Sequence, residues 1–280
     1  MCPTDSEVSI SSSAHGLEAV LDSIDGDPTL ALRKLEGKND PESVKRRFAI
    51  LLEHDRHEEI ATEAQAIAND VQWIELAIVA LCETGKIDAA LDRLSWALKS
   101  GNINTARRSA IAYADGTFKR LFSNRPDSSA LAPGALSDSE LGLLRPALQA
   151  LQDVTKNALD NQEPENELES QTLLRILDLA FLLEDGGTGE KCAKALLKRK
   201  PVPPKIGQAV IRGVIPPTSD VVDRLWGEHP DTFRPRLLAC LIQWNMLKQP
   251  SEAGARALML VPFANQDDEK SELAHVLKEL

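Results

Sequence analysis

The residues best suited to do chemistry form a basic block, the stretch from residue 191 to residue 212, which contains no acidic residue. Lys191, Lys194 and Lys198 have the i, i+3, i+7 spacing of one helical face. In a chain of net charge −11, this block could bind phosphate, a nucleic-acid backbone or an acidic partner. The alternative is a helix C-terminus whose cations complement its dipole and pair with the acidic stretch 160–169. The candidate partner-binding residues are Lys191, Lys194, Lys198, Arg199 and Lys200.

Two further groups contain the residue types of a ligand site without its context. His54, His57 and Glu58 have the spacing of metal ligands, but they lie where one predicted helix ends and the next begins. The glycines of residues 186–189, followed by Glu190 and Lys191, lack the GxxxxGK[ST] spacing and preceding strand of a phosphate-binding loop. We predict an exposed helix end at the first group, a turn between two helices at the second, and no metal or cofactor at either.

No set of residues predicts catalysis. The five histidines lie apart from the four cysteines, and no nucleophile motif is present. The cysteines form no CxxC pair, which argues against zinc, and Cys82 and Cys240 lie in apolar stretches typical of buried, reduced thiols. The chain is therefore not expected to be an enzyme. A helical active site assembled from scattered carboxylates stays open as an alternative.

Composition favours helix packing on helix. The apolar share is 42% but only 4% of the residues are aromatic, so Ala and Leu supply most of the apolar surface. The net charge of −11 disfavours binding of nucleic acid by the chain as a whole. The N-terminal residues lack a signal-peptide pattern, and no run of 18 apolar residues occurs, so we expect a soluble cytoplasmic protein without membrane contact.

Helix start signals and apolar spacing predict helices along most of the chain. Five prolines between residues 201 and 217 interrupt further short helices. The predicted helices span residues 17–24, 28–35, 41–52, 57–68, 73–84, 87–100, 103–122, 137–159, 168–183, 234–247, 252–260 and 267–280.

One segment, residues 73–102, resembles a tetratricopeptide repeat. The family's W-x2-L-G-x2-Y spacing falls on Trp73, Leu76, Ala77 and Ala80, and its second-helix spacing on Ala90, Leu94 and Ala97. It departs from the family at Ala77 and Ala80, which replace Gly and Tyr, and its turn is one residue longer. Weaker echoes lie at residues 47–69 and 238–262. The resemblance implies stacked helix pairs with Ala90 and Ala97 at a helix–helix contact.

The resemblance also predicts what the first helix of this repeat does. Family members often hold an acidic peptide terminus with cations on that helix, but no cation lies between Val71 and Thr84. The corresponding side chains are Ile74, Ile78 and Leu81, which form an apolar face. We expect the protein's own helices to cover this face rather than a partner.

These features predict an all-α protein, a helical-hairpin array resembling a tetratricopeptide α-solenoid with a further helical C-terminal region. The predicted parts are a flexible leader at 1–15, the array at 16–124, a linker loop at 125–136 and the C-terminal helices at 137–280. By class analogy, we expect a protein-interaction or scaffolding module with a protein partner. The alternative is an accessory subunit of a larger assembly whose basic block contacts phosphate or nucleic acid.

Overall fold

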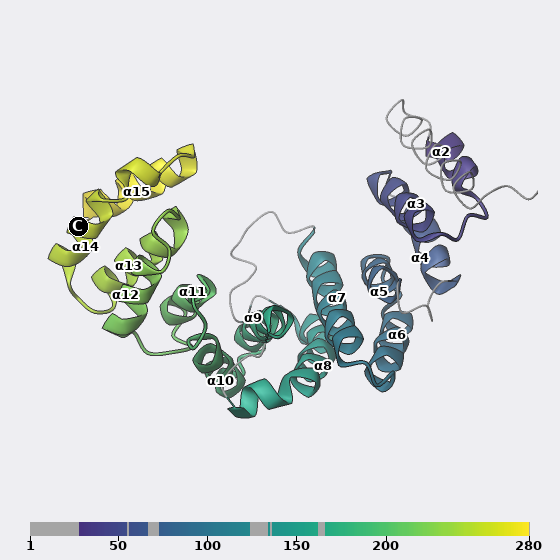
Figure 1. Ribbon diagram of the computed structural model, residues 1–280, viewed down its shortest axis with the longest axis horizontal. Helices are drawn as coiled ribbons and strands as arrows, with labels where there is room; N and C mark the ends of the chain where they lie inside the picture. The colour runs from purple at the N-terminus through teal and green to yellow at the C-terminus, as the bar shows by residue number, and fades with distance from the viewer. Residues whose placement is uncertain are drawn as a thin grey trace, which may run out of the picture. The chain divides into compact units, whose positions relative to one another are not determined.

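The computed structural model describes residues 28–54, 56–66, 73–123, 134, 136–161 and 166–279. In this part of the chain the regular structure is entirely helical, which confirms the predicted all-α class (Figure 1). The chain divides into two compact units, Met1–Pro126 (unit 1) and Asp127–Leu280 (unit 2). The predicted leader, the predicted helix at 17–24 and nearly all of the predicted linker lie outside the described residues.

Two helices of unit 1 begin at capping residues that the sequence displays. Asp40 Oδ1 accepts a hydrogen bond of 3.0 Å from the Ser43 amide, and hydrogen bonds from Ser43 hold the Asp40 pKa below its usual value. Asn102 caps the last helix through the amides of Asn104 and Thr105. The helices are α2 (Pro28–Leu35), α3 (Pro41–Glu53), α4 (His57–Ala66), α5 (Ile74–Glu83), α6 (Ile87–Lys99) and α7 (Ile103–Phe122).

Helix α5 lies at the centre of unit 1. It packs against α4, α6 and α7, so helices of the same chain enclose it. Ile74, Ile78 and Leu81 each have 0% exposure, and the apolar face is therefore internal, as expected. Ala90 and Ala97 of α6 are also fully buried, which agrees with their predicted position at a helix contact.

Helices α5 and α7 approach each other closely, and Gly116 permits this approach. A Cβ atom at Gly116 would lie 2.8 Å from Cys82 Cβ and 3.1 Å from Val79 Cα. The Cys82 thiol is buried beside this contact, and burial raises its pKa to about 11, so it stays protonated and unreactive at neutral pH.

Gly116→Ala should therefore destabilise the protein although alanine is the better helix former. Overpacking costs about 1–3 kcal/mol, and the 2.8 Å approach to Cys82 Cβ favours the upper half of that range. The gain in helix propensity is about 1 kcal/mol, so the expected net loss is about 1–2 kcal/mol. Gly142 lies in a helix of unit 2 with no atom within 4 Å of its added Cβ, so Gly142→Ala should stabilise instead. Urea unfolding of both variants measures the contrast. Equal effects would contradict the tight α5–α7 contact.

Unit 2 is a succession of helices in which neighbours in the sequence pack on each other. Ser137 and Glu140 form the predicted capping box, since the Ser137 amide donates to Glu140 Oε2 at 2.8 Å. The first helix then continues through Pro146. The elements are α8 (Asp138–Asn161), α9 (Glu167–Leu182), α10 (Gly186–Leu196), α11 (Lys205–Ile211), α12 (Ser219–Gly227), α13 (Phe233–Asn245), α14 (Pro250–Leu258), the 3-10 helix η2 (Val261–Phe263) and α15 (Asp267–Glu279).

The glycine-rich stretch at residues 186–189 is not the turn that its composition predicts. It forms the first turn of α10, because the Asp185 carboxylate accepts a hydrogen bond of 3.1 Å from the Thr188 amide and so caps the helix. At Gly189 an added Cβ would lie 3.0 Å from Val214 Cγ1, so tight packing favours glycine there. The chain reverses instead at residues 183–185.

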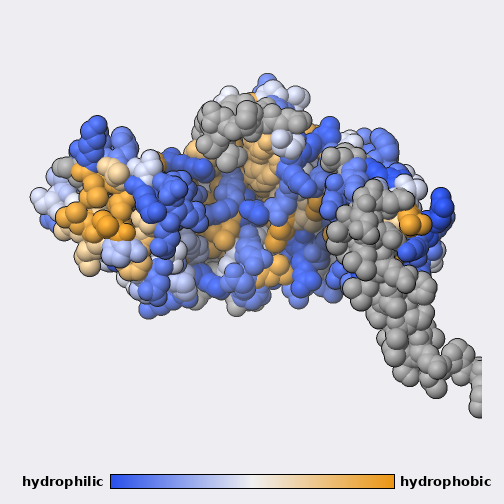
Figure 2. All heavy atoms as spheres, turned by 90° about the horizontal axis from the view of Figure 1, so that it is seen from above, coloured by the Kyte–Doolittle hydropathy of each residue, from blue (hydrophilic) through white to orange (hydrophobic). Residues whose placement is uncertain are grey.

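The C-terminal helices of unit 2 pack around a layered cation–aromatic cluster. The Arg236 guanidinium lies 3.9 Å from the centre of the Trp226 ring and 4.8 Å from that of Phe263, and Arg256 lies 5.5 Å from that of Trp226. Figure 2 shows hydrophobic surface at this end of the unit, on the left of the view. Large apolar side chains exposed nearby are Leu258, Met259 and Val261. Among the helices described, none combines the length and apolar character needed to cross a membrane.

Candidate partner-binding site

The basic block covers the second half of α10, the following segment and α11. Helix α10 ends at Leu196, so Lys198 lies in the turn beyond it. The predicted shared helical face is therefore limited to Lys191 and Lys194. Lys191, Lys194, Lys198 and Lys200 are exposed, whereas Arg199 is half-buried.

Several cations of the block are engaged within the protein. Lys194 pairs with Glu190 at 2.6 Å on the same helix. Arg199 Nη2 donates to Glu167 Oε2 at 2.6 Å. Glu167 belongs to the acidic stretch 160–169, with which the basic block was expected to pair if its cations serve the fold. Lys205 pairs with Asp178. The Arg212 guanidinium lies 4.4 Å from the centre of the Phe181 ring.

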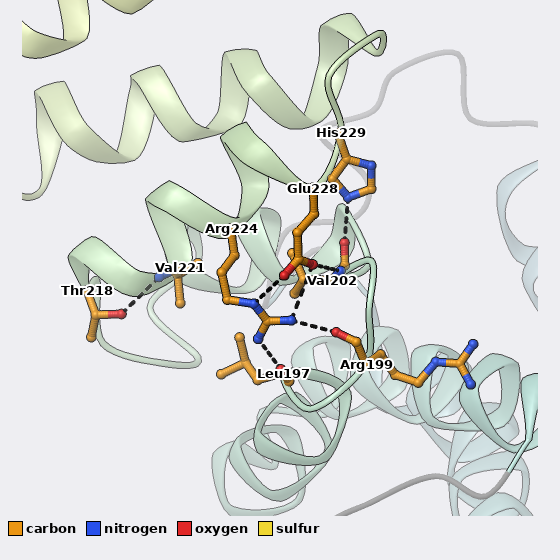
Figure 3. Close-up of polar contacts among 8 residues, drawn as sticks. All are labelled: Leu197, Arg199, Val202, Thr218, Val221, Arg224, Glu228 and His229. Carbon is orange, nitrogen blue, oxygen red and sulfur yellow. Dashed lines mark hydrogen bonds and ion pairs between the residues drawn. The ribbon is translucent and has the colours of Figure 1, made fainter.

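The backbone that carries these lysines is fixed by one arginine from another helix. Arg224 of α12 donates from Nη1 to the carbonyl of Leu197 and from Nη2 to that of Arg199, the latter at 2.6 Å (Figure 3). Carbonyls at a helix C-terminus lack partners within the helix, and a guanidinium satisfies them and complements the helix dipole. Arg224 thus caps the C-terminal end of α10, although it lies 25 residues or more along the chain from the carbonyls that it binds.

Glu228 and His229 complete this network one turn further along. Glu228 Oε1 accepts from Arg224 Nε at 2.8 Å, and its Oε2 accepts from the buried Val202 amide at 2.6 Å. The hydrogen bond from Arg224, followed by that from Val202, holds the Glu228 pKa below its usual value. His229 Nε2 lies 2.7 Å from the Val202 carbonyl, so both backbone groups of Val202 are satisfied.

Three cations of the block remain available to a partner. Within the described part of the chain, Lys191, Lys198 and Lys200 form neither an ion pair nor a hydrogen bond through their side chains, and all three are exposed. The charge of Lys200 contributes, as the smallest of the causes, to the lowered pKa of Glu228. Two of the three lysines lie on the segment that Arg224 holds. The arrangement is a fixed backbone that presents free ammonium groups, and it can attract a negatively charged group without reorganisation of the loop.

The sequence did not predict the network of Arg224, Glu228 and His229. Arg224 and Glu228 have i, i+4 spacing, which signals an ion pair on one helix, but nothing in that spacing shows a second set of acceptors at Leu197 and Arg199. The long-range contact depends on how α10 and α12 are placed in the fold. Only the structure shows that the backbone of the basic block also connects α10 to α12 through Arg224.

The other candidate group, His54, His57 and Glu58, lies at the junction between α3 and α4. His54 follows the last residue of α3 and His57 is the first residue of α4, so one helix ends and the next begins within this group, as predicted. Glu58 instead pairs with Lys86 at 3.6 Å. Among the described residues, no group of three or more His, Cys, Asp or Glu side chains is arranged to hold a metal ion.

Comparison with known proteins does not assign this chain to a family. No protein-family model, no curated protein and no solved structure matches the chain.

Proposed function

We propose that this protein is a cytoplasmic interaction module built from tetratricopeptide-like helix pairs, without catalytic activity, and that it binds an acidic segment of a partner protein. The observation that carries the proposal is the set of unpaired lysines, Lys191 on α10 and Lys198 and Lys200 on the segment that the Arg224 network fixes. Two observations support tetratricopeptide-like helix pairs. Helices that follow one another in the sequence pack on each other, and the alanines Ala90 and Ala97 of α6 are buried.

The chemistry of the site favours an acidic protein over single-stranded nucleic acid. Sites for single strands interleave aromatic side chains with cations so that bases can stack. The segment from 191 to 212 contains no aromatic residue, and Phe181, the aromatic ring beside it, is already covered by Arg212. A carboxylate-rich segment needs only the positive potential that the three lysines supply.

Charge reversal of the three lysines tests the proposal. The triple variant Lys191→Glu, Lys198→Glu and Lys200→Glu should abolish capture of the partner from the protein's own cells while the melting temperature stays unchanged. Each surface cation contributes little to folding, because exposed ion pairs are worth about 0–1 kcal/mol. Wild-type capture should also weaken when salt rises, because exposed charges are screened.

The matched control is a second triple variant of equal charge, Lys45→Glu, Lys99→Glu and Lys156→Glu, whose parent side chains are exposed elsewhere in the chain. It should capture the partner as the wild type does. Equal loss in both variants would show a net-charge effect and would refute a local site. Nucleic acid in the captured fraction, removed by nuclease together with the binding, would instead support the accessory-subunit alternative.

A further inference from the structure

Helices α2, α3 and α4 of unit 1, together with the turn that follows α2, line a cavity of about 460 Å³ that is open to solvent. Its apolar wall is formed by Leu32 of α2 and the buried Leu51 of α3. The rest of the lining consists of two arginines, three glutamates, two threonines and Gly37. The volume lies within the range of roughly 300–1,000 Å³ of small-molecule sites, which combine an apolar surface with a few polar groups.

One side of the cavity is a rigid guanidinium. Arg47 is only 7% exposed, and its Nε donates to both carboxylate oxygens of Glu63 at 3.0 and 3.1 Å. Its Nη1 donates to the carbonyls of Leu35, at 2.8 Å, and Lys38 at the end of α2. Within the described part of the chain, Nη2 is the guanidinium nitrogen of Arg47 that donates no hydrogen bond.

The remaining charges leave one cation and one anion uncompensated. Glu63 is neutralised by Arg47, and Glu59 forms a two-point pair with Arg56. In the described residues, neither Arg33 nor Glu36 forms an ion pair, although both line the cavity. Arg33 lies in the last turn of α2 and Glu36 is the first residue of the turn that follows it, so the two side chains come from adjacent parts of the cavity wall.

We propose that this cavity binds a free amino acid with a large apolar side chain. Its carboxylate pairs with Arg33 and with the Nη2 group of Arg47. Its ammonium pairs with Glu36, and its side chain packs on Leu32 and Leu51. A phosphorylated metabolite would bring no cation to Glu36, and a purely apolar ligand would desolvate Arg33 and Glu36 without pairing them.

Calorimetric titration of the full chain with L-leucine and two analogues separates these contacts. Leucinamide lacks the carboxylate, and 4-methylpentanoate lacks the ammonium. L-Leucine should bind, and each analogue should bind at least about tenfold more weakly, because each loses one charge-assisted contact. Titrations with L-isoleucine, L-methionine and L-phenylalanine cover the other large apolar side chains. Absence of binding by all four amino acids up to their solubility limits would overturn the proposal.

Variants of the two unpaired side chains assign the binding to this cavity. Arg33→Gln and Glu36→Gln should each weaken L-leucine binding at least about tenfold. The circular dichroism spectrum should stay unchanged, because both side chains are exposed. The control is Arg46→Gln, which removes a guanidinium that pairs with Glu42 on α3 and does not line the cavity. Unchanged affinity in Arg33→Gln and Glu36→Gln would overturn the proposal, whatever the wild-type affinity.

Discussion

Replacing Ile78 with glutamate is expected to destabilise the protein by at least about 4 kcal/mol. Ile78 has no exposed surface, and α4, α6 and α7 enclose the helix that carries it. The variant loses a buried apolar side chain and places a carboxylate where no charged partner is available. Urea unfolding followed by circular dichroism measures the loss. Ser95→Glu adds a carboxylate to the exposed face of α6 in the same hairpin and should change stability by less than about 0.5 kcal/mol.

The destabilisation by Ile78→Glu should also depend on pH in a defined direction. Burial raises the pKa of the new carboxyl in the folded state above its unfolded value of about 4.3. The penalty is therefore smallest below pH 4.3 and grows as pH rises above it, because only the unfolded chain can then release the proton freely. A variant that keeps full stability but loses partner binding would show that this face is an open binding site.

Local signals explain how closely the helices could be predicted from the sequence. Pro28, and Asp40 before Pro41, mark helix starts that depend only on adjacent residues, and the structure begins α2 and α3 there. The capping box at Ser137 is equally local. Apolar spacing also predicted that α5 is internal, since three large apolar side chains share a face without any cation.

Features that join distant parts of the chain could not be predicted in this way. The glycines at 186–189 suggested a turn by composition, but the Asp185 cap and the packing at Gly189 make them helical. Nothing in the sequence indicated that Arg47 pairs with Glu63, which lies sixteen residues further along the chain. The repeat family and the scaffolding role stay predictions, because an all-helical fold is compatible with many functions.

The second large effect on stability is expected at Arg224, whose hydrogen bonds join two distant parts of the chain. Arg224→Ala should cost about 3 kcal/mol, because it removes the donors to the Leu197 and Arg199 carbonyls and leaves Glu228 without its cation. Arg234 supplies the control. It also pairs with two carboxylates, Asp268 and Glu272, but its side chain is 50% exposed, so Arg234→Ala should cost less than about 1 kcal/mol.

Two readouts tie the Arg224 effect to the network rather than to general loss of packing. The Glu228 pKa is depressed in the folded state, so the stabilisation by this pair is present above the unfolded value of about 4.3 and is lost as pH falls below it. Arg224→Ala should therefore reduce the acid-induced loss of stability. Glu228→Gln should speed hydrogen exchange of the Val202 amide, which donates to this carboxylate. If Arg224→Ala and Arg234→Ala cost the same, Arg224 does not fix the segment, and the free lysines beside it would lose the rigid backbone on which the proposed partner site depends.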